Sequence, residues 1–299
     1  MVYTNISLVL DANVTLLETP IWDDRTKRLY CTDLFTGDVH VFDPDTGSDV
    51  LYHTGGGTIG SAIPTSDPEK LLCALERGIC LFDMNTGALT FVSDPNGGNE
   101  KNRYNDTRVD ARGRIFTSTV SKLYGTADYK PDMLGDFYMV DTDGTVKKIV
   151  AGINQYNCIA WNADNTEMFV IDTFNSKLIS FDYDIEQGPV SEPKQRLDLS
   201  VIGMPDGISI DSEDSLYICH WAGKISVWDK TLHMVRVLDF PVDQVCCGGF
   251  GGDKLTDLYI ATARYSYTPE QMADRRGAGG LFHMSVKTAG TKDHYYPIK

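Results

Sequence analysis

The chain has 299 residues, a formal net charge of −15 and an ordinary globular composition, with 42% hydrophobic residues. The acidic balance argues against nucleic-acid binding, because phosphate recognition needs clustered Lys and Arg. No apolar run approaches the ~18 residues that would argue for a membrane-spanning helix.

The N-terminal sequence lacks the basic segment and the long apolar segment of a signal peptide, which favours a cytoplasmic protein. The seven cysteines contain no CxxC pair, and most lie in apolar, strand-like runs. Cysteines of this kind are usually buried and reduced, which agrees with the cytosol. The sequence does not separate a monomer from a small homo-oligomer.

One unit recurs six times along the chain: a short apolar strand, a polar turn and a second apolar strand, most often followed by Asp with Gly nearby. The copies start at Leu29, Leu71, Ile115, Met168, Leu216 and Leu258. A step of roughly 40 to 50 residues matches one four-stranded propeller blade. The sequence therefore predicts an all-β, six-bladed β-propeller that fills residues 1–299 as a single domain. An eight-stranded sandwich would not explain six copies of one unit.

Two further segments have expected places in the propeller. A strand over Ile6–Leu10 precedes the first copy and should complete the last blade, which closes the ring and removes open sheet edges. The third copy contains a long insertion over residues 121–133. Long loops on a rigid scaffold often cover sites, although a plain solvated loop is an equal alternative here.

Four of the copies carry an oxygen-bearing side chain ten or eleven residues before the repeat start, namely Glu18, Asn105, Asn157 and Asp206. In a propeller the first strand of each blade lies nearest the axis, so these side chains should meet at one mouth of the channel. Carboxylate and amide oxygens are hard ligands that suit Ca²⁺, Mg²⁺, Mn²⁺ or Zn²⁺. Single Asn and Asp residues more often fix turns, but four in register favour a site.

The other two copies carry small residues at the same height, Gly60-Ser61 and Cys247-Gly248. They should leave the room that a ligand in the channel needs. Arg103 and Asp106, which flank Asn105, extend the polar constellation.

The motifs Glu18-Thr-Pro-Ile-Trp, Asn102-Arg103-Tyr104-Asn105-Asp106, Asn157-Cys-Ile-Ala-Trp and Pro205-Asp206-Gly207 follow one another in order. At these residues the sequence resembles the gluconolactonase/regucalcin family, also called the senescence-marker-protein family. The resemblance implies one divalent metal ion in the channel, held by Glu18, Asn157 and Asp206. It implies that Arg103 and Asn105, with Asp106 beside them, bind a sugar lactone, and that Asp206 is the general base.

The sequence departs from the family pattern in three places. Thr19 and Cys158 stand where many members have glycine. Ser121, Lys122 and Leu123 occupy the region in which some members place a substrate-binding glutamate. These changes leave the metal site intact and leave the identity of the substrate open.

Together these features predict a divalent-metal-dependent lactonase that opens an aldonolactone, such as a glucono- or pentonolactone. The metal would polarise the carbonyl while Asp206 takes a proton from water and returns it to the ring oxygen. A metal-bound hydroxide is an alternative nucleophile. A related propeller hydrolase for phosphotriesters or a specialised lactone, and a non-enzymatic divalent-metal-binding protein, are the alternative functions.

Overall fold

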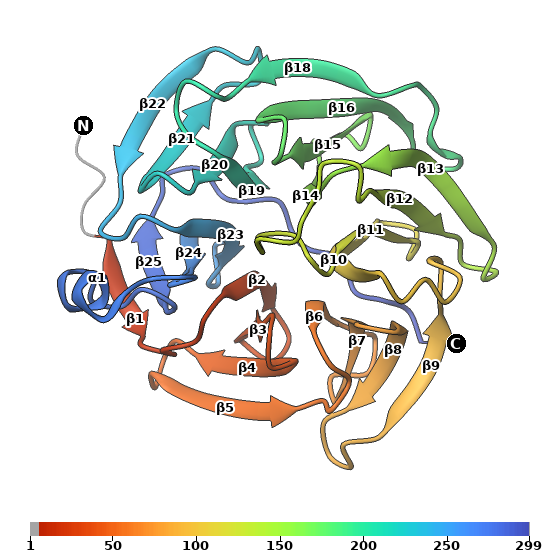
Figure 1. Ribbon diagram of the computed structural model, residues 1–299, viewed down its shortest axis with the longest axis horizontal. Helices are drawn as coiled ribbons and strands as arrows, with labels where there is room; N and C mark the ends of the chain where they lie inside the picture. Colours follow the sequence, from red (N-terminus) through yellow and green to blue (C-terminus); the bar gives the residue numbers. More distant parts are fainter. Residues whose placement is uncertain (1–5, 299) are drawn as a thin grey trace.

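The computed structural model describes residues 6–298 and consists of six antiparallel sheets that surround a central channel like blades (Figure 1). This confirms the predicted six-bladed β-propeller. The prediction that residues 1–299 form a single domain stays a prediction, and positions 1–5 and 299 lie outside the described residues. In residues 6–298 no helix is long and apolar enough to cross a membrane.

The first three blades each follow the chain from the axis outward. The first consists of β2 (Leu17–Asp23), β3 (Arg28–Asp33), β4 (Asp38–Asp43) and β5 (Ser48–His53). The second consists of β6 (Ile59–Pro64), β7 (Lys70–Leu75), β8 (Gly78–Asp83) and β9 (Leu89–Ser93). The third consists of β10 (Asn102–Val109), β11 (Ile115–Ser121), β12 (Gly135–Val140) and β13 (Val146–Ile153).

The remaining blades complete the ring. The fourth consists of β14 (Tyr156–Trp161), β15 (Glu167–Asp172), β16 (Lys177–Asp184) and β18 (Lys194–Asp198), with β17 (Gly188–Pro189) paired to the end of β16. The fifth consists of β19 (Pro205–Ile210), β20 (Leu216–His220), β21 (Lys224–Trp228) and β22 (Met234–Asp239). The sixth consists of β23 (Val245–Gly251), β24 (Asp257–Thr262), β25 (Leu281–Ser285) and β1 (Ser7–Leu10).

The closing strand lies where the sequence predicts it. β1 comes from the start of the chain and pairs antiparallel with β25, so the sixth blade joins an N-terminal strand to three strands from the later part of the chain (Figure 1). The helix α1 (Pro269–Asp274) lies in the insertion between β24 and β25. Because the last blade needs β1 to reach four strands, the ring is held shut by main-chain hydrogen bonds.

Burial follows the position of each strand in its blade. The inner strand β2 is buried at every residue, whereas the outer strand β5 consists of exposed and half-buried residues. The inner strands contact one another around the axis, and apolar side chains such as Trp22 and Phe42 pack between neighbouring blades. A rigid ring of buried inner strands therefore surrounds the channel and fixes whatever side chains point into it.

The C-terminal segment crosses one face of the ring. Gly290 pairs with Asp211 beside the fifth blade, and Tyr296 pairs with Thr65 beside the second. Tyr295 stacks under the guanidinium of Arg25 at 3.9 Å. This segment covers the face at which the inner strands end, so the mouth that the predicted site faces lies at the opposite end of the channel.

Candidate active site

Each of the six inner strands carries an irregularity at the same height. The register with the second strand shifts after Glu18, Ile59, Tyr104, Asn157, Pro205 and Val245. A β-bulge bends a strand and redirects its side chains, and bulges often lie next to active sites. Because the bulge recurs at the same height, it explains why side chains from different inner strands point into the same part of the channel.

Two of the departures from the family pattern lie within these bulges. Thr19 and Cys158 adopt left-handed backbone conformations, with φ of 46° and 44°. Glycine adopts such angles without steric cost, whereas a β-branched residue such as threonine is strained there. A glycine at these two positions would therefore have a structural reason, and this chain adopts the left-handed backbone with Thr19 and Cys158 despite the strain.

The four predicted side chains converge. Asn157 lies between two of its predicted partners: its Oδ1 accepts a hydrogen bond from Asn105 Nδ2, and its Nδ2 donates to Asp206 Oδ1 at 2.6 Å. Asn157 Nδ2 also donates to Thr173 Oγ1 at 2.7 Å. Asn105, Asn157 and Asp206 are 4–6% exposed. The three blades that carry them are therefore locked together through one buried amide.

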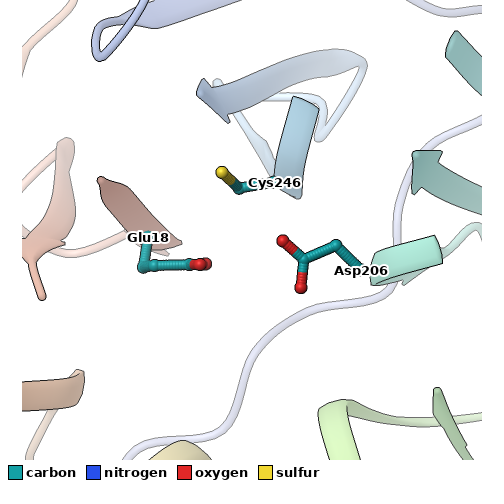
Figure 2. Close-up of side chains that lie close together, drawn as sticks. All are labelled: Glu18, Asp206 and Cys246. Atoms are coloured by element: carbon teal, nitrogen blue, oxygen red, sulfur yellow. The ribbon is translucent and has the colours of Figure 1, made fainter. Parts of the chain in front are cut away.

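Glu18 and Asp206 face each other across the channel, with Cys246 beside them (Figure 2). One ligand atom from each of the three lies within 4.8 Å of the others. The Glu18 carboxylate also accepts a hydrogen bond from Cys247 Sγ at 3.0 Å, and Asp206 Oδ2 accepts one from Trp221 Nε1 at 2.7 Å. These contacts orient both carboxylates before any ligand arrives.

The electrostatics of this group are unfavourable without a cation. Burial, followed by the charges of Asp206 and Asp106, raises the pKa of Glu18 well above its ordinary value. Burial and the charge of Asp106 raise the pKa of Asp206 to about 8. Like charges that share a buried site disfavour each other's ionised form. Ionising both carboxyl groups therefore places negative charge in this site that a divalent cation would compensate.

Arg103 and Asp106 occupy different surroundings. Arg103 Nη1 donates to Asn105 Oδ1 at 2.9 Å, and burial lowers the pKa of its guanidinium to about 10. Asp106 is buried and accepts a hydrogen bond from the Cys158 backbone N–H at 2.6 Å. Arg103 lines the cavity above the site, whereas Asp106 is not among the lining residues. The structure thus brings Arg103 to the predicted substrate position and places Asp106 behind it.

A cavity of about 430 Å³ opens above these residues. Its polar floor is formed by Glu18, Arg103, Asn105, Gln155, Asn157 and Asp206. Four residues of the 121–133 insertion, namely Tyr124, Gly125, Thr126 and Tyr129, form part of its wall. The insertion therefore covers the site, which decides between the two roles that the sequence left open.

The glycines among the small residues of the second and sixth blades lie in tight packing. A Cβ at Gly60 would lie 2.1 Å from the carbonyl oxygen of Asn105, and one at Gly248 would lie 2.9 Å from Ser209 Oγ. Neither glycine lines the cavity. Gly60 lets β6 approach β10 closely, and the expectation that the small residues make room for a ligand stays a prediction.

Several functional neighbours escaped the sequence reasoning. Trp221 donates a hydrogen bond to Asp206, and Thr173 accepts one from Asn157. Each of these two residues directly follows the second strand of its own blade. Leu34 occupies the same repeat position and also lines the cavity. The signal was available, because the end of each second strand lies beside the start of an inner strand at the same mouth.

Comparison with known proteins identifies the family to which the chain belongs. The family model of the SMP-30/Gluconolactonase/LRE-like region matches residues 16–264. The chain belongs to this family. The family resemblance seen in the sequence is therefore confirmed for most of the chain.

Individual relatives cover nearly the whole chain. A pentonolactonase of Haloferax volcanii is 28% identical over 298 residues, which cover 95% of this chain and 96% of the relative. Human regucalcin is 26% identical and covers 94% of each chain. A calcium-binding regucalcin of Agrobacterium tumefaciens has a TM-score of 0.90 at 22% identity and covers 99% of this chain and 98% of its own, which supports the fold.

Proposed function

We propose that this chain is a divalent-metal-dependent lactonase that opens a sugar-acid lactone, such as a glucono- or pentonolactone. The observation that carries the proposal is the convergence of Glu18, Asn157 and Asp206 from three blades on the floor of one cavity. The pentonolactonase of Haloferax volcanii, a relative in the same family, supports this class of reaction.

The donor set fits a divalent cation. Glu18 and Asp206 would supply carboxylate oxygens, and Asn157 an amide oxygen once its amide turns so that Oδ1 replaces Nδ2 beside Asp206. Such oxygens are the ligands of hard cations. The raised pKa values of both carboxyl groups reflect a negative charge that the protein itself does not balance. The calcium-binding neighbour favours Ca²⁺, whereas the thiol of Cys246 beside the carboxylates would suit Zn²⁺. When bound, the ion would polarise the lactone carbonyl and stabilise the negative charge that develops on it.

Asp206 is the proposed general base. Hydrogen bonds from Asn157 and Trp221, one to each carboxylate oxygen, hold it in a fixed orientation. Water would lose a proton to Asp206 as its oxygen bonds to the carbonyl carbon. The bond between that carbon and the ring oxygen then breaks, and the ring oxygen takes the proton from Asp206. The product is the open-chain hydroxy acid.

Arg103 and Asn105 are the proposed substrate contacts. Arg103 is held by Asn105 and by the carbonyl of Tyr104 through a single nitrogen, Nη1. A guanidinium offers five N–H donors, so Arg103 can donate to ring hydroxyls or to the lactone oxygen. We propose that Asp106 acts next to them through its charge, since it raises the pKa of both Glu18 and Asp206.

The test compares metal-free and metal-restored protein on a panel of aldonolactones, with a phosphotriester included. We expect lactone turnover only after a divalent ion is added, and a loss of roughly 10² to 10⁴ in kcat for Asp206→Asn. Asp239→Asn, at a 91% exposed side chain of the same blade, is the matched control and should retain full turnover. Metal-independent turnover, or no turnover of any lactone, would contradict the proposal. Hydrolysis of the phosphotriester alone would favour the alternative hydrolase.

A further inference from the structure

The cavity changes character between its floor and its mouth. The floor residues Asn105, Asn157 and Asp206 are nearly buried, whereas Phe35 and Phe174 are 45% and 42% exposed. Six aromatic side chains line the part of the cavity above the floor: Phe35, Tyr124, Tyr129, Phe174, Trp221 and Tyr265. We call these six residues the aromatic rim.

The rim is held together by ring contacts between distant parts of the chain. Phe35 stacks on Tyr265, with centroids 5.7 Å apart and planes 14° apart. Tyr129 makes edge contacts with Tyr124 at 5.1 Å and with Phe174 at 6.3 Å. Four blades contribute to these contacts. The rim is therefore a preformed surface, so a ligand does not have to order it.

The polar atoms of the rim are mostly engaged inside the protein. Tyr129 donates its hydroxyl to Asn154 Oδ1 at 2.8 Å, and Tyr265 donates to the Gly125 carbonyl at 3.3 Å. The indole N–H of Trp221 donates to Asp206. What these residues leave for a ligand is the faces and edges of their rings.

Two more hydroxyl groups belong to residues that line this cavity, those of Thr126 and Tyr124. Thr126 donates its hydroxyl to the Leu123 carbonyl at 2.7 Å. Burial and the charge of Asp206 raise the pKa of Tyr124 to about 12, so its hydroxyl stays protonated at neutral pH. Donors for a polar substrate therefore concentrate at the floor, near the reacting carbonyl.

This change from a polar floor to an aromatic rim distinguishes polar from apolar substituents on the lactone ring. A hydroxyl group carried into the rim would give up its hydrogen bonds to water and find few partners, which is unfavourable. An apolar group would leave water and contact aromatic rings, and each buried methylene contributes about 0.8 kcal/mol, or about fourfold in an equilibrium.

Resting on the proposed function, we propose that the preferred substrate is a sugar lactone whose ring carries an apolar exocyclic group. This group is a methyl, a longer alkyl or a benzyl group in place of hydroxymethyl, and it lies against the aromatic rim while the carbonyl and ring hydroxyls face the floor. The long insertion at 121–133 thus acts as a specificity element, because it supplies two of the six rim residues.

The experiment uses four lactones that share one ring and differ at the exocyclic carbon: hydroxymethyl, methyl, benzyl and glucosyloxymethyl. With metal-restored protein we expect kcat/KM to rise from hydroxymethyl to methyl, because no hydroxyl gives up its hydrogen bonds to water. We expect it to rise further to benzyl, by at least the roughly fourfold that one buried methylene contributes. The glucosyl lactone tests the competing idea that the rings stack on a second sugar. Equal or better turnover of the hydroxymethyl or glucosyl lactone would overturn the inference.

Variants connect the preference to the rim. Phe35→Ser combined with Phe174→Ser should reduce the benzyl-to-hydroxymethyl ratio of kcat/KM by about tenfold. Both side chains are more than 40% exposed, so the double variant should fold. Phe91→Ser is the matched control, because Phe91 is 65% exposed on β9 and lies outside this cavity. A ratio that is unchanged in the double variant would overturn the role of the rim.

The corresponding lactams, which resist hydrolysis, separate the two proposals. If no lactone is hydrolysed but calorimetry shows tighter binding of the benzyl lactam than of the hydroxymethyl lactam, the lactonase proposal is wrong and the rim preference stands. Lactones hydrolysed without any preference, or lactams bound equally well, would refute the rim preference alone.

Discussion

Arg114 is a buried charge outside the candidate active site, and its removal gives a sharp test of how the blades are joined. Its side chain is 2% exposed, and Nε donates to Asp110 Oδ2 at 2.6 Å. Nη2 donates to the Tyr183 hydroxyl at 2.9 Å and to the Ile185 carbonyl at 2.8 Å, while Nη1 donates to the Glu186 carbonyl at 3.0 Å. One guanidinium thus connects the third blade to the fourth.

Arg114→Met keeps an unbranched stem but leaves the Asp110 carboxylate without its cation and two carbonyls without their donor. Breaking a buried ion pair in this way costs about 3 to 5 kcal/mol. At ~2 to 4 °C per kcal/mol for a protein of this general size, we expect the melting temperature to fall by roughly 6 to 20 °C.

The assay is calorimetric melting at fixed pH and fixed metal concentration, with urea unfolding as a second measure. Arg112→Met is the matched control, because Arg112 pairs with Glu186 at the surface, with side chains 43% and 68% exposed. Exposed pairs contribute about 0 to 1 kcal/mol, so this control should melt close to the parent protein. Equal melting of both variants would refute the reasoning about the buried network.

Three further predictions concern other features of the fold and the site. In metal-free protein the pKa of the Asp206 carboxyl is raised from 3.8 to about 8. Its favourable contribution to the free energy of folding is therefore present at low pH and is lost as the pH rises toward 8. The melting temperature should fall over that pH range, and Asp206→Asn should make this fall smaller. Gly60→Ala forces a Cβ against the Asn105 carbonyl; calorimetry should show about 1 to 3 kcal/mol of destabilisation, and lactone turnover should fall with it. A thiol reagent should label only Cys80 rapidly in native protein, since the six other free cysteines are buried; rapid labelling that persists in Cys80→Ser would contradict this.

The blades and their order could be predicted from the sequence because each repeat contains the same alternation of strands and turns. Asp43 shows the local reason: its side chain accepts a hydrogen bond from the Asp45 backbone at 3.0 Å, and Gly47, with φ of 72°, closes the turn. The turn at Asp83 and Gly87 has the same form. Such turns depend on neighbouring residues alone, so they can be recognised in the sequence without knowledge of the fold.

The polar residues at equivalent positions of the repeats were predictable because the repeats can be aligned with one another. The structure brings three of them, Glu18, Asn157 and Asp206, together. What the sequence did not reveal depends on contacts between blades. The partnership of Trp221 with Asp206 and the close approach of Gly60 to Asn105 join residues far apart in the chain. The left-handed conformation of Thr19 is likewise hidden, because threonine rarely adopts it.

The central claim is that one divalent ion binds between Glu18, Asn157 and Asp206. The most direct measurement is a crystal structure of protein soaked with a divalent ion, with anomalous scattering used to locate it. The account predicts one strong peak in the channel, with oxygens of these three side chains within roughly 2.0 to 2.6 Å of the ion. No peak there, or an ion that Asp206 does not contact, would contradict the account.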